Sequence, residues 1–260
     1  MNTSPLGTLD MALLKEIFFR LVPKLMLPQR SASILMYHSV NASRDSFSTV
    51  SPEEFNRQMA YLAGKKLSVI PLAELVRRLR AGKMLGGSVT LTFDDGYRDN
   101  YTEVFPLLKQ YGFPATVFVT TDFIGRESYC AAEELREMHD SGLISIEPHT
   151  LSHPKLAKLS RGAAAREVRE SRSVLASILG TVPTLFAYPY GDFSGETVDI
   201  VREAGFVGAV TVEEGTVSSD TDPFRLPRNS VDGSTTFSQF SGKVSRAIDW
   251  YTALKAFLRP

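Results

Sequence analysis

The chain has 260 residues, of which 43% are hydrophobic and 22% are charged, and these ordinary proportions fit one large globular domain or two small ones. Its 29 lysines and arginines balance 29 aspartates and glutamates, so charge does not argue for a nucleic-acid partner. The single cysteine excludes a disulfide within the chain and is compatible with a reducing compartment.

An N-terminal extension, residues 1–32, is expected to be helical. Its stretch 9–27 is rich in apolar residues but contains several charged ones, whereas a membrane-spanning helix needs about 20 mostly apolar residues. The apolar side chains recur with helical spacing, which fits either a helix packed on the main domain or a helix in peripheral contact with a membrane. No secretory signal pattern is seen at the N-terminus, which favours a cytoplasmic location.

From residue 33 to residue 234, short β-rich runs alternate with stretches of helical spacing. Strands are predicted at 34–37, 67–70, 88–93, 115–120, 143–147, 185–188 and 206–212. Helices are predicted at 51–63, 71–80, 98–111, 131–141, 160–179 and 195–204. This alternation favours one α/β domain with a parallel sheet and outer helices, either a barrel or an open doubly wound sheet. Residues 235–260 are expected to form a helical tail packed on that domain.

Two adjacent carboxylates end the strand predicted at 88–93. Asp94 and Asp95 follow the apolar run directly, and Gly96 breaks the strand after them. In α/β proteins the active site lies where strands end, and two carboxylates that approach one another repel unless a cation or a proton separates them. A metal ion on one and a free base on the other would resolve this repulsion. On its own, however, Asp-Asp-Gly is more often the cap of a helix, here one starting near Tyr97.

A pair of histidines follows the weaker strand at 143–147. His149 and His153 are four residues apart, and a proline brackets the pair on each side. If the segment is helical, the two rings lie on one face and can hold a metal ion as helical zinc sites do. Asp95, His149 and His153 would then form a two-histidine, one-carboxylate set with positions left open for water, the arrangement of a catalytic metal site.

The segment Thr92 to Gly96, together with His149-Thr-Leu-Ser-His153, resembles the polysaccharide deacetylases, carbohydrate esterase family four. Further matches are Pro114-Ala-Thr-Val-Phe-Val119 and Tyr188-Pro-Tyr-Gly191, and the resemblance covers roughly residues 34–233. It implies a distorted (β/α)7 barrel, which agrees with the independent count of βα repeats. It also implies a hydrolase that removes N-acetyl groups from N-acetylated amino sugars of a polysaccharide or its precursor.

The resemblance implies a role for each motif residue. Asp95, His149 and His153 bind the divalent metal, usually zinc, with cobalt or nickel as alternatives. Asp94 stays off the metal and acts as general base on the metal-bound water, whose pKa the ion lowers toward neutrality. The oxyanion of the tetrahedral intermediate would be held by the metal and by a backbone N–H, that of Tyr190.

Two positions depart from the family pattern. Ala187 stands where the third motif usually carries an arginine, and the chain has no histidine after His153 to serve as general acid. His38, at the end of the first predicted strand, is the candidate for the missing acid. Both departures resemble the branch that includes the biofilm poly-N-acetylglucosamine deacetylases. Arg228 is the candidate to contact Asp94 in place of the missing arginine.

Substrate contacts are predicted around the third and the last motif. Pro189 and Tyr190, together with Leu226 and Arg228, are assigned to the substrate and oxyanion side of the site. Leu226 and Tyr190 would form the pocket for the acetyl methyl group. The segment that holds Leu226 is equally well explained as the end of a strand.

Three functions fit these residues. The first is a metal-dependent de-N-acetylase acting on an N-acetylated glycan. The second keeps this chemistry on a lipid-linked sugar, as a deacetylase or deformylase at the membrane surface, because the stretch 9–27 combines basic and apolar residues. The third is a glycan-binding barrel without catalysis, which the two departures would explain. The carboxylate of Asp94 beside the metal ligands argues against the third function, because a binding module does not need it.

Overall fold

The computed structural model describes residues 16, 18–20, 31–43, 46–83, 85–245 and 247–251. A five-stranded parallel sheet has the order β6-β5-β4-β1-β9, with β1 (Ser33–Tyr37), β4 (Val89–Phe93), β5 (Ala115–Val119), β6 (Ile144–Pro148) and β9 (Asn229–Ser230). Two further parallel pairs are β7 (Leu185–Ala187) with β8 (Gly208–Val210), and β2 (Ser39–Val40) with β3 (Thr49–Val50).

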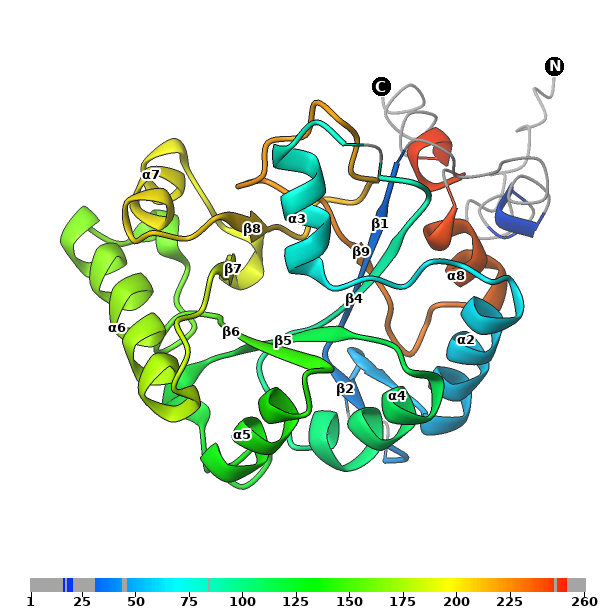
Figure 1. Cartoon of the computed structure of the whole chain (residues 1–260), viewed down its shortest axis with the longest axis horizontal. Helices are drawn as coiled ribbons and strands as arrows, with labels where there is room; N and C mark the ends of the chain where they lie inside the picture. The colour runs from blue at the N-terminus through cyan, green and yellow to red at the C-terminus, as the bar shows by residue number, and fades with distance from the viewer. Residues whose placement is uncertain are drawn as a thin grey trace, which may run out of the picture.

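The sheet and the β7–β8 pair together form a distorted barrel (Figure 1). The segment before and within β9 closes one side, because Leu226 pairs with Val210 of β8 while Asn229 pairs with Leu35 of β1. On the other side β6 and β7 pack together, but within the described residues no backbone ladder joins them. We call this junction the β6–β7 seam. The predicted α/β class and the distorted barrel are therefore confirmed.

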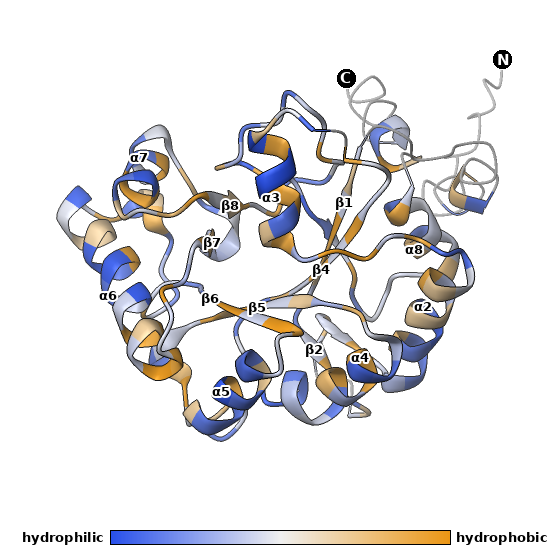
Figure 2. Cartoon of the chain, viewed as in Figure 1, coloured by the Kyte–Doolittle hydropathy of each residue, from blue (hydrophilic) through white to orange (hydrophobic). Residues whose placement is uncertain are grey.

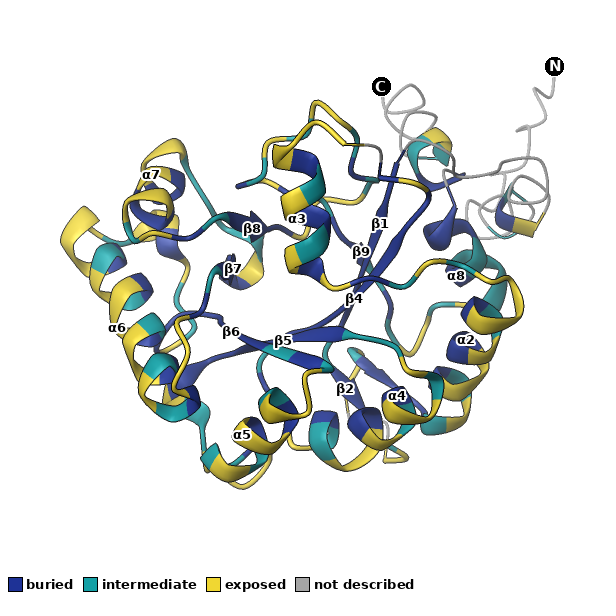
Figure 3. Cartoon of the chain, viewed as in Figure 1, coloured by how far each residue is buried: buried dark blue, intermediate teal, exposed yellow. Residues whose placement is uncertain are grey.

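Helices cover the outside of the barrel (Figure 1). They are α2 (Pro52–Gly64), α4 (Phe105–Tyr111), α5 (Ala132–Asp140), α6 (Arg161–Leu179), α7 (Gly195–Glu203) and α8 (Phe237–Val244), with a π-helical turn at Asn100–Val104 and 3-10 turns at Thr121–Phe123, Leu156–Lys158 and Pro189–Gly191. Their outward faces are hydrophilic and exposed, and their inward faces are apolar and buried (Figures 2 and 3). This is the pattern expected of helices that shield a parallel sheet.

Helix α3 (Leu72–Arg80) lies between β8 and β1 in the view of Figure 1. Its buried residues recur at helical spacing and belong to one core cluster with residues of β1, β5, β7 and β8; they are Leu72, Leu75, Val76 and Leu79. This helix therefore packs against the short strands β7 and β8 and contributes apolar side chains to the core beside them.

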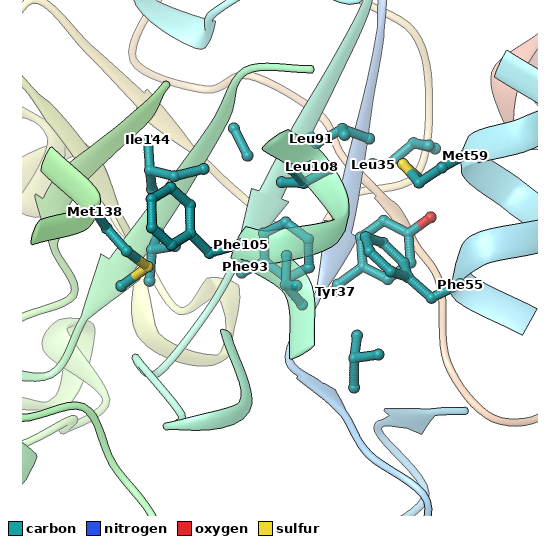
Figure 4. Close-up of a cluster of buried hydrophobic side chains, with 14 of the residues drawn as sticks. Leu35, Tyr37, Phe55, Met59, Leu91, Phe93, Phe105, Leu108, Met138 and Ile144 are labelled. Atoms are coloured by element: carbon teal, nitrogen blue, oxygen red, sulfur yellow. The ribbon is translucent and has the colours of Figure 1, made fainter. Parts of the chain in front are cut away.

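The main core lies between the sheet and helices α2, α4 and α5 (Figure 4). Tyr37 of β1 stacks on Phe93 of β4 at 5.2 Å between ring centroids, and Phe55 of α2 packs edge-on to both rings. Because side chains alternate along a strand, these residues leave the alternate positions, such as Thr92, to face the barrel interior. The same alternation directs Asp94 inward.

Local sequence signals explain where several helices begin and end. Ser51 caps α2 by accepting a hydrogen bond from the Glu54 N–H, as its position before Pro52 predicts. Helices α4 and α6 end at Gly112 and Gly180, whose φ values of 64° and 69° lie in the left-handed region that favours glycine.

Two predicted elements were wrong in detail, and strand β9 was missed. The strand at 67–70 is reduced to a single bridge between Val69 and Val89. The helix predicted at 98–111 starts as the π-helical turn and becomes α-helical only at Phe105. Strand β9 was not predicted, because two residues flanked by turns give no periodic pattern.

The N-terminal prediction falls mostly outside the described residues. Of the stretch 9–27, the structure describes residue 16 and residues 18–20. Phe19 is buried against Ala247 and Ile248, and Glu16 accepts a hydrogen bond from the Thr236 hydroxyl at 2.7 Å. No helix in the described ranges is both long enough and apolar enough to cross a membrane. The tail beyond residue 251 and peripheral membrane contact stay predictions.

Candidate active site

The predicted site residues gather at one end of the barrel. Asp94 and Asp95 follow β4, His149 follows β6, His38 follows β1 and Tyr190 follows β7. Because these strands run parallel, their carboxyl ends lie at the same mouth, where the active sites of such barrels are built.

Asp95, His149 and His153 form a group of three metal-ligating side chains. The Asp95 Oδ1 atom lies 3.3 Å from His153 Nε2 and 3.8 Å from His149 Nε2, and the two Nε2 atoms are 3.1 Å apart. A tetrahedral ion with bonds of roughly 2.0–2.1 Å holds its ligand atoms about 3.4 Å apart. Two imidazole nitrogens and one carboxylate oxygen are also a ligand set that zinc accepts, so these residues fit a divalent metal.

The histidine pair does not lie on a helix, so the helical geometry considered for it from the spacing does not apply. Thr150 and His153 have φ values of 68° and 63°, so the segment is a tight loop. The loop is anchored by Glu167 of α6, whose carboxylate accepts hydrogen bonds from the Leu151 and Ser152 N–H groups at 3.0 Å. The two rings therefore meet because the loop is folded back, not because of helical spacing.

Left-handed backbone is concentrated at the site. In the described chain, five non-glycine residues have positive φ, and four of them lie here: Asp95, Thr150, His153 and Tyr190. Such conformations are unfavourable for residues with a side chain by about 1–3 kcal/mol and persist where the surrounding structure imposes them. The barrel mouth thus holds its functional residues in conformations that they would not adopt alone.

His149 is buried and its orientation is fixed. Its Nδ1 lies 2.8 Å from the Ala187 carbonyl oxygen, an acceptor, so the proton resides on Nδ1 and Nε2 keeps its lone pair toward Asp95 and His153. Burial lowers the pKa of His149 and favours this neutral form. The side chain is therefore prepared to ligate through Nε2.

Asp94 pairs with Arg228, the contact proposed from the sequence. Arg228 is fully buried, and its Nη1 and Nη2 donate to the two carboxylate oxygens of Asp94 at 2.7 and 2.6 Å. The guanidinium also donates to the Thr211 carbonyl oxygen and the Thr92 hydroxyl. Burial by itself would raise the pKa of Asp94, but the Arg228 charge and hydrogen bonds lower it to about 2. Asp94 therefore stays ionised at neutral pH.

His38 is partly buried beside Asp94. The Asp94 N–H donates to the Tyr37 carbonyl oxygen at 2.9 Å, and a charged His38 contributes to the lowered pKa of Asp94. The backbone of His38 is held by Asn100, whose Nδ2 donates to the His38 carbonyl oxygen at 2.9 Å. The sequence interpretation missed Asn100, which carries no signal beyond its place near the carboxylates.

The residues predicted to contact the substrate lie partly in the core and partly at the surface. Pro189 is buried, whereas Tyr190 is 58% exposed and its ring centroid lies 4.5 Å from that of His153. Leu226 is fully buried in the core cluster around α3, and its backbone pairs with Val210. This placement agrees with the strand-end alternative for Leu226, and its acetyl-pocket role stays a prediction.

Glu147 was also missed. It is buried on β6, and burial raises its pKa to about 7. One carboxylate oxygen accepts hydrogen bonds from the Thr184 and Leu185 N–H groups at 2.8 Å. The available signal was a charged residue within a strand of a predicted parallel sheet, because such strands are covered on both faces and charged residues are almost never fully buried without partners.

Comparison with known proteins agrees with this geometry. The family model described as polysaccharide deacetylase matches residues 81–209. The chain is 32% identical over 212 residues to YxkH of Bacillus subtilis, a protein provisionally named polysaccharide deacetylase, covering 81% of this chain and 75% of that protein. It is 28% identical over 193 residues to the poly-β-1,6-N-acetyl-D-glucosamine N-deacetylase of Staphylococcus epidermidis, covering 69% and 67% of the two chains.

Solved structures share the fold. The deacetylase PplD of Streptococcus pyogenes, in complex with acetate, superposes with a TM-score of 0.77 at 25% identity, over 84% of this chain and 99% of that chain. IcaB from Ammonifex degensii superposes with a TM-score of 0.76 at 28% identity, with the same coverage of 84% and 99%. The residues matched by the family model include strands β4 to β7 and both the carboxylate and the histidine motifs. With the similarity to YxkH, they show that the chain belongs to the polysaccharide deacetylase family.

Proposed function

We propose that this protein hydrolyses the N-acetyl groups of N-acetylated amino sugars in a polysaccharide. The observation that carries the proposal is the different pairing of two adjacent carboxylates. Asp95 lies with His149 and His153, whereas Asp94 is held ionised by Arg228 beside that group. A binding module has no need of such a base next to metal ligands. The staphylococcal relative, named for a poly-N-acetylglucosamine substrate, supports a polymer of this class.

Asp95, His149 and His153 are the residues that would hold a divalent cation, with zinc as our choice because of its preference for imidazole and carboxylate ligands. When bound, the ion supplies a Lewis acid for the acetyl carbonyl and lowers the pKa of a coordinated water. The role of the protein is to present the three ligand atoms on one side and leave the other side open to substrate.

Asp94 acts as general base in this proposal. It accepts a proton from the attacking water while the water oxygen bonds to the acetyl carbonyl carbon. Its pKa of about 2 keeps it ionised, and the two hydrogen bonds from Arg228 fix the carboxylate plane. The proton is therefore received at a fixed position.

His38 acts as general acid. As the carbon–nitrogen bond breaks, its ring donates a proton to the amine nitrogen, and acetate and the free amino sugar are released. The oxyanion that precedes this step would accept a hydrogen bond from the Tyr190 N–H, whose turn lies against His153. One water is consumed for each acetyl group removed.

The proposal is tested by metal content and acetate release measured on the same samples. Wild type and Asp94→Asn would be loaded with zinc, and elemental analysis would be followed by assays on β-1,6- and β-1,4-linked N-acetylglucosamine oligomers. We expect about one ion per chain in both proteins and acetate only from wild type. A zinc-loaded wild type that releases acetate from neither glycan would contradict the proposal and favour lipid-linked sugars as substrates. The cytoplasmic location stays a prediction.

A further inference from the structure

The β6–β7 seam interrupts the backbone hydrogen bonding of the barrel. The strands β1, β4, β5 and β6 are joined in sequence by parallel ladders, and β7 is joined to β8. At the seam, two strands pack side by side without such a ladder in the described chain (Figure 1). Buried strand edges leave N–H and C=O groups that need other partners.

Two side chains supply these partners. Glu147 Oε2 accepts from the Thr184 and Leu185 N–H groups, where β7 begins. His149 Nδ1 donates to the Ala187 carbonyl oxygen, where β7 ends. Glu147 and His149 are two residues apart and so project from the same face of the β6 segment. The pair therefore holds both ends of β7, and one member of the pair is a metal ligand.

We propose that Glu147 is a positioning residue for the metal ligand His149. The Glu147 carboxylate holds the start of β7 through its two backbone hydrogen bonds, and this positions the Ala187 carbonyl oxygen at the end of β7. That oxygen in turn orients the His149 ring so that Nε2 faces Asp95 and His153. This inference rests on the proposed metal binding, and it adds a residue that touches neither metal nor substrate.

The contacts of Glu147 indicate that its hydrogen bonds, rather than its charge, do the positioning. One oxygen accepts both backbone N–H groups, and the other accepts from the Ser145 hydroxyl at 2.9 Å. A glutamine could keep all three contacts, because its carbonyl oxygen accepts both N–H groups and the serine hydroxyl can accept from its amide. Alanine at this position would leave the buried Leu185 N–H and the partly buried Thr184 N–H without this acceptor.

The test is the zinc dissociation constant, measured by chelator competition on folded protein. We expect Glu147→Ala to weaken zinc binding by about 10-fold to 100-fold, the range for loss of groups that orient a metal ligand. Glu147→Gln should remain within about 3-fold of wild type. Glu147→Asp keeps the charge but is one methylene shorter, so it should weaken zinc binding toward the value of the alanine variant. It replaces the alanine variant in the test if that variant does not fold.

Two control variants separate positioning from general destabilisation. Val201→Ala removes buried volume on α7, in the core cluster that includes β7 and β8 residues, and should lower the melting temperature while zinc affinity is unchanged. Ser145→Ala removes only the third contact of Glu147 and should change zinc affinity by less than about 3-fold.

The outcomes are distinct for the two proposals. Wild type that binds no zinc would contradict the proposed metal site itself. Wild type that binds zinc, with folded Glu147→Ala and Glu147→Asp binding equally tightly, would overturn the positioning role alone. A glutamine variant as weak as the alanine variant would overturn it as well, because charge would then be the determinant. Weak binding in alanine and aspartate with recovery in glutamine supports it.

Discussion

Asp94 and Asp95 are neighbours in the chain, yet their carboxylates lie in different surroundings. Asp94 is buried inside the barrel mouth, and both of its oxygens accept from Arg228. Asp95 is only half-buried and lies within 4 Å of the Nε2 atoms of His149 and His153. One carboxylate is thus held by a permanent cation of the protein, and the other is directed to a place where a metal cation fits.

The backbone at Asp95 separates the two side chains. Asp95 and Gly96 have φ values of 72° and 78°, so the extended strand ends abruptly after Asp94. A Cβ at Gly96 would lie 3.2 Å from both methyl carbons of Val119, in addition to the strain of positive φ. Two identical carboxyl groups thus have different environments, and different environments are how carboxylate pairs in hydrolases are given different roles. Each prediction below tests one side of this difference.

The largest effect is expected for Asp95→Ala. Loss of one of three ligands should abolish tight zinc binding, and acetate release should fall by about 10⁴-fold because several kcal/mol of charge stabilisation is lost. Zinc content and acetate release should fall together. An active variant that keeps its zinc would remove Asp95 from the ligand set.

Asp94→Asn should separate the two properties. We expect zinc content to stay at the wild-type level while kcat falls by about 10³-fold, since general-base catalysis contributes roughly 10²–10⁴-fold. Elemental analysis and acetate release on one preparation provide the check. Loss of zinc in this variant would mean that Asp94 is a metal ligand as well, and that Asp94 and Asp95 do not differ in the way described above.

His38→Ala is expected to lower kcat by about 10²-fold with unchanged zinc content. The rate of acetate release and the zinc content would be measured on the same preparation. His139→Ala is a matched control, because this histidine lies on α5 and contacts Thr181. Equal losses in both variants would argue against a specific role of His38.

Arg228→Lys should lower catalysis through Asp94. It also alters the hydrogen bonds of the guanidinium to the Thr211 carbonyl oxygen and the Thr92 hydroxyl. Lysine keeps the positive charge but cannot donate two parallel hydrogen bonds to one carboxylate, so kcat should fall by about 10-fold. The pKa of Asp94 should rise, which moves the acidic limb of the pH–rate profile to higher pH. Zinc affinity should be retained. An unchanged profile would show that Arg228 does not determine the protonation of Asp94.

The smallest predicted effect is on stability in acid. The pKa of Asp94 is lowered from 3.8 to about 2 in the folded protein, so its ionised form stabilises the fold above pH 4. This contribution, about 2 kcal/mol, should be lost as pH falls from 4 toward 2. Urea unfolding of metal-free wild type and Asp94→Asn at several pH values would measure it. Parallel pH dependence in the two proteins would contradict the assignment.

Much of the site was accessible from the sequence because its signals are local. The apolar run before Asp94, the glycine after Asp95 and the short spacing of His149 and His153 can each be recognised within a few residues. The alternation of β-rich and helical stretches likewise follows from periodicities of 2 and 3.6 residues. It was sufficient to predict an α/β domain with a parallel sheet, whereas the choice of a barrel over an open doubly wound sheet rested on the resemblance to the deacetylases.

Other features depended on which strands become neighbours. Arg228 lies 134 positions after Asp94, and the two meet because the segment at β9 closes the barrel beside β1. The sequence could only suggest Arg228 by the absence of the usual arginine. The conformation of the loop that holds His149 and His153 could not be derived from the sequence, because the spacing of the two histidines does not report the left-handed backbone at Thr150 and His153.

The sequence by itself determined the α/β class of the fold and singled out the side chains that are candidates for metal binding, because these follow from short-range pattern and residue type. The tertiary structure alone decided how those side chains are held. Arg228 on Asp94, Ala187 on His149 and Glu147 across the β6–β7 seam are contacts between residues 37 or more positions apart. Such contacts depend on strand order and on where a ladder is interrupted, and neither is encoded in local periodicity.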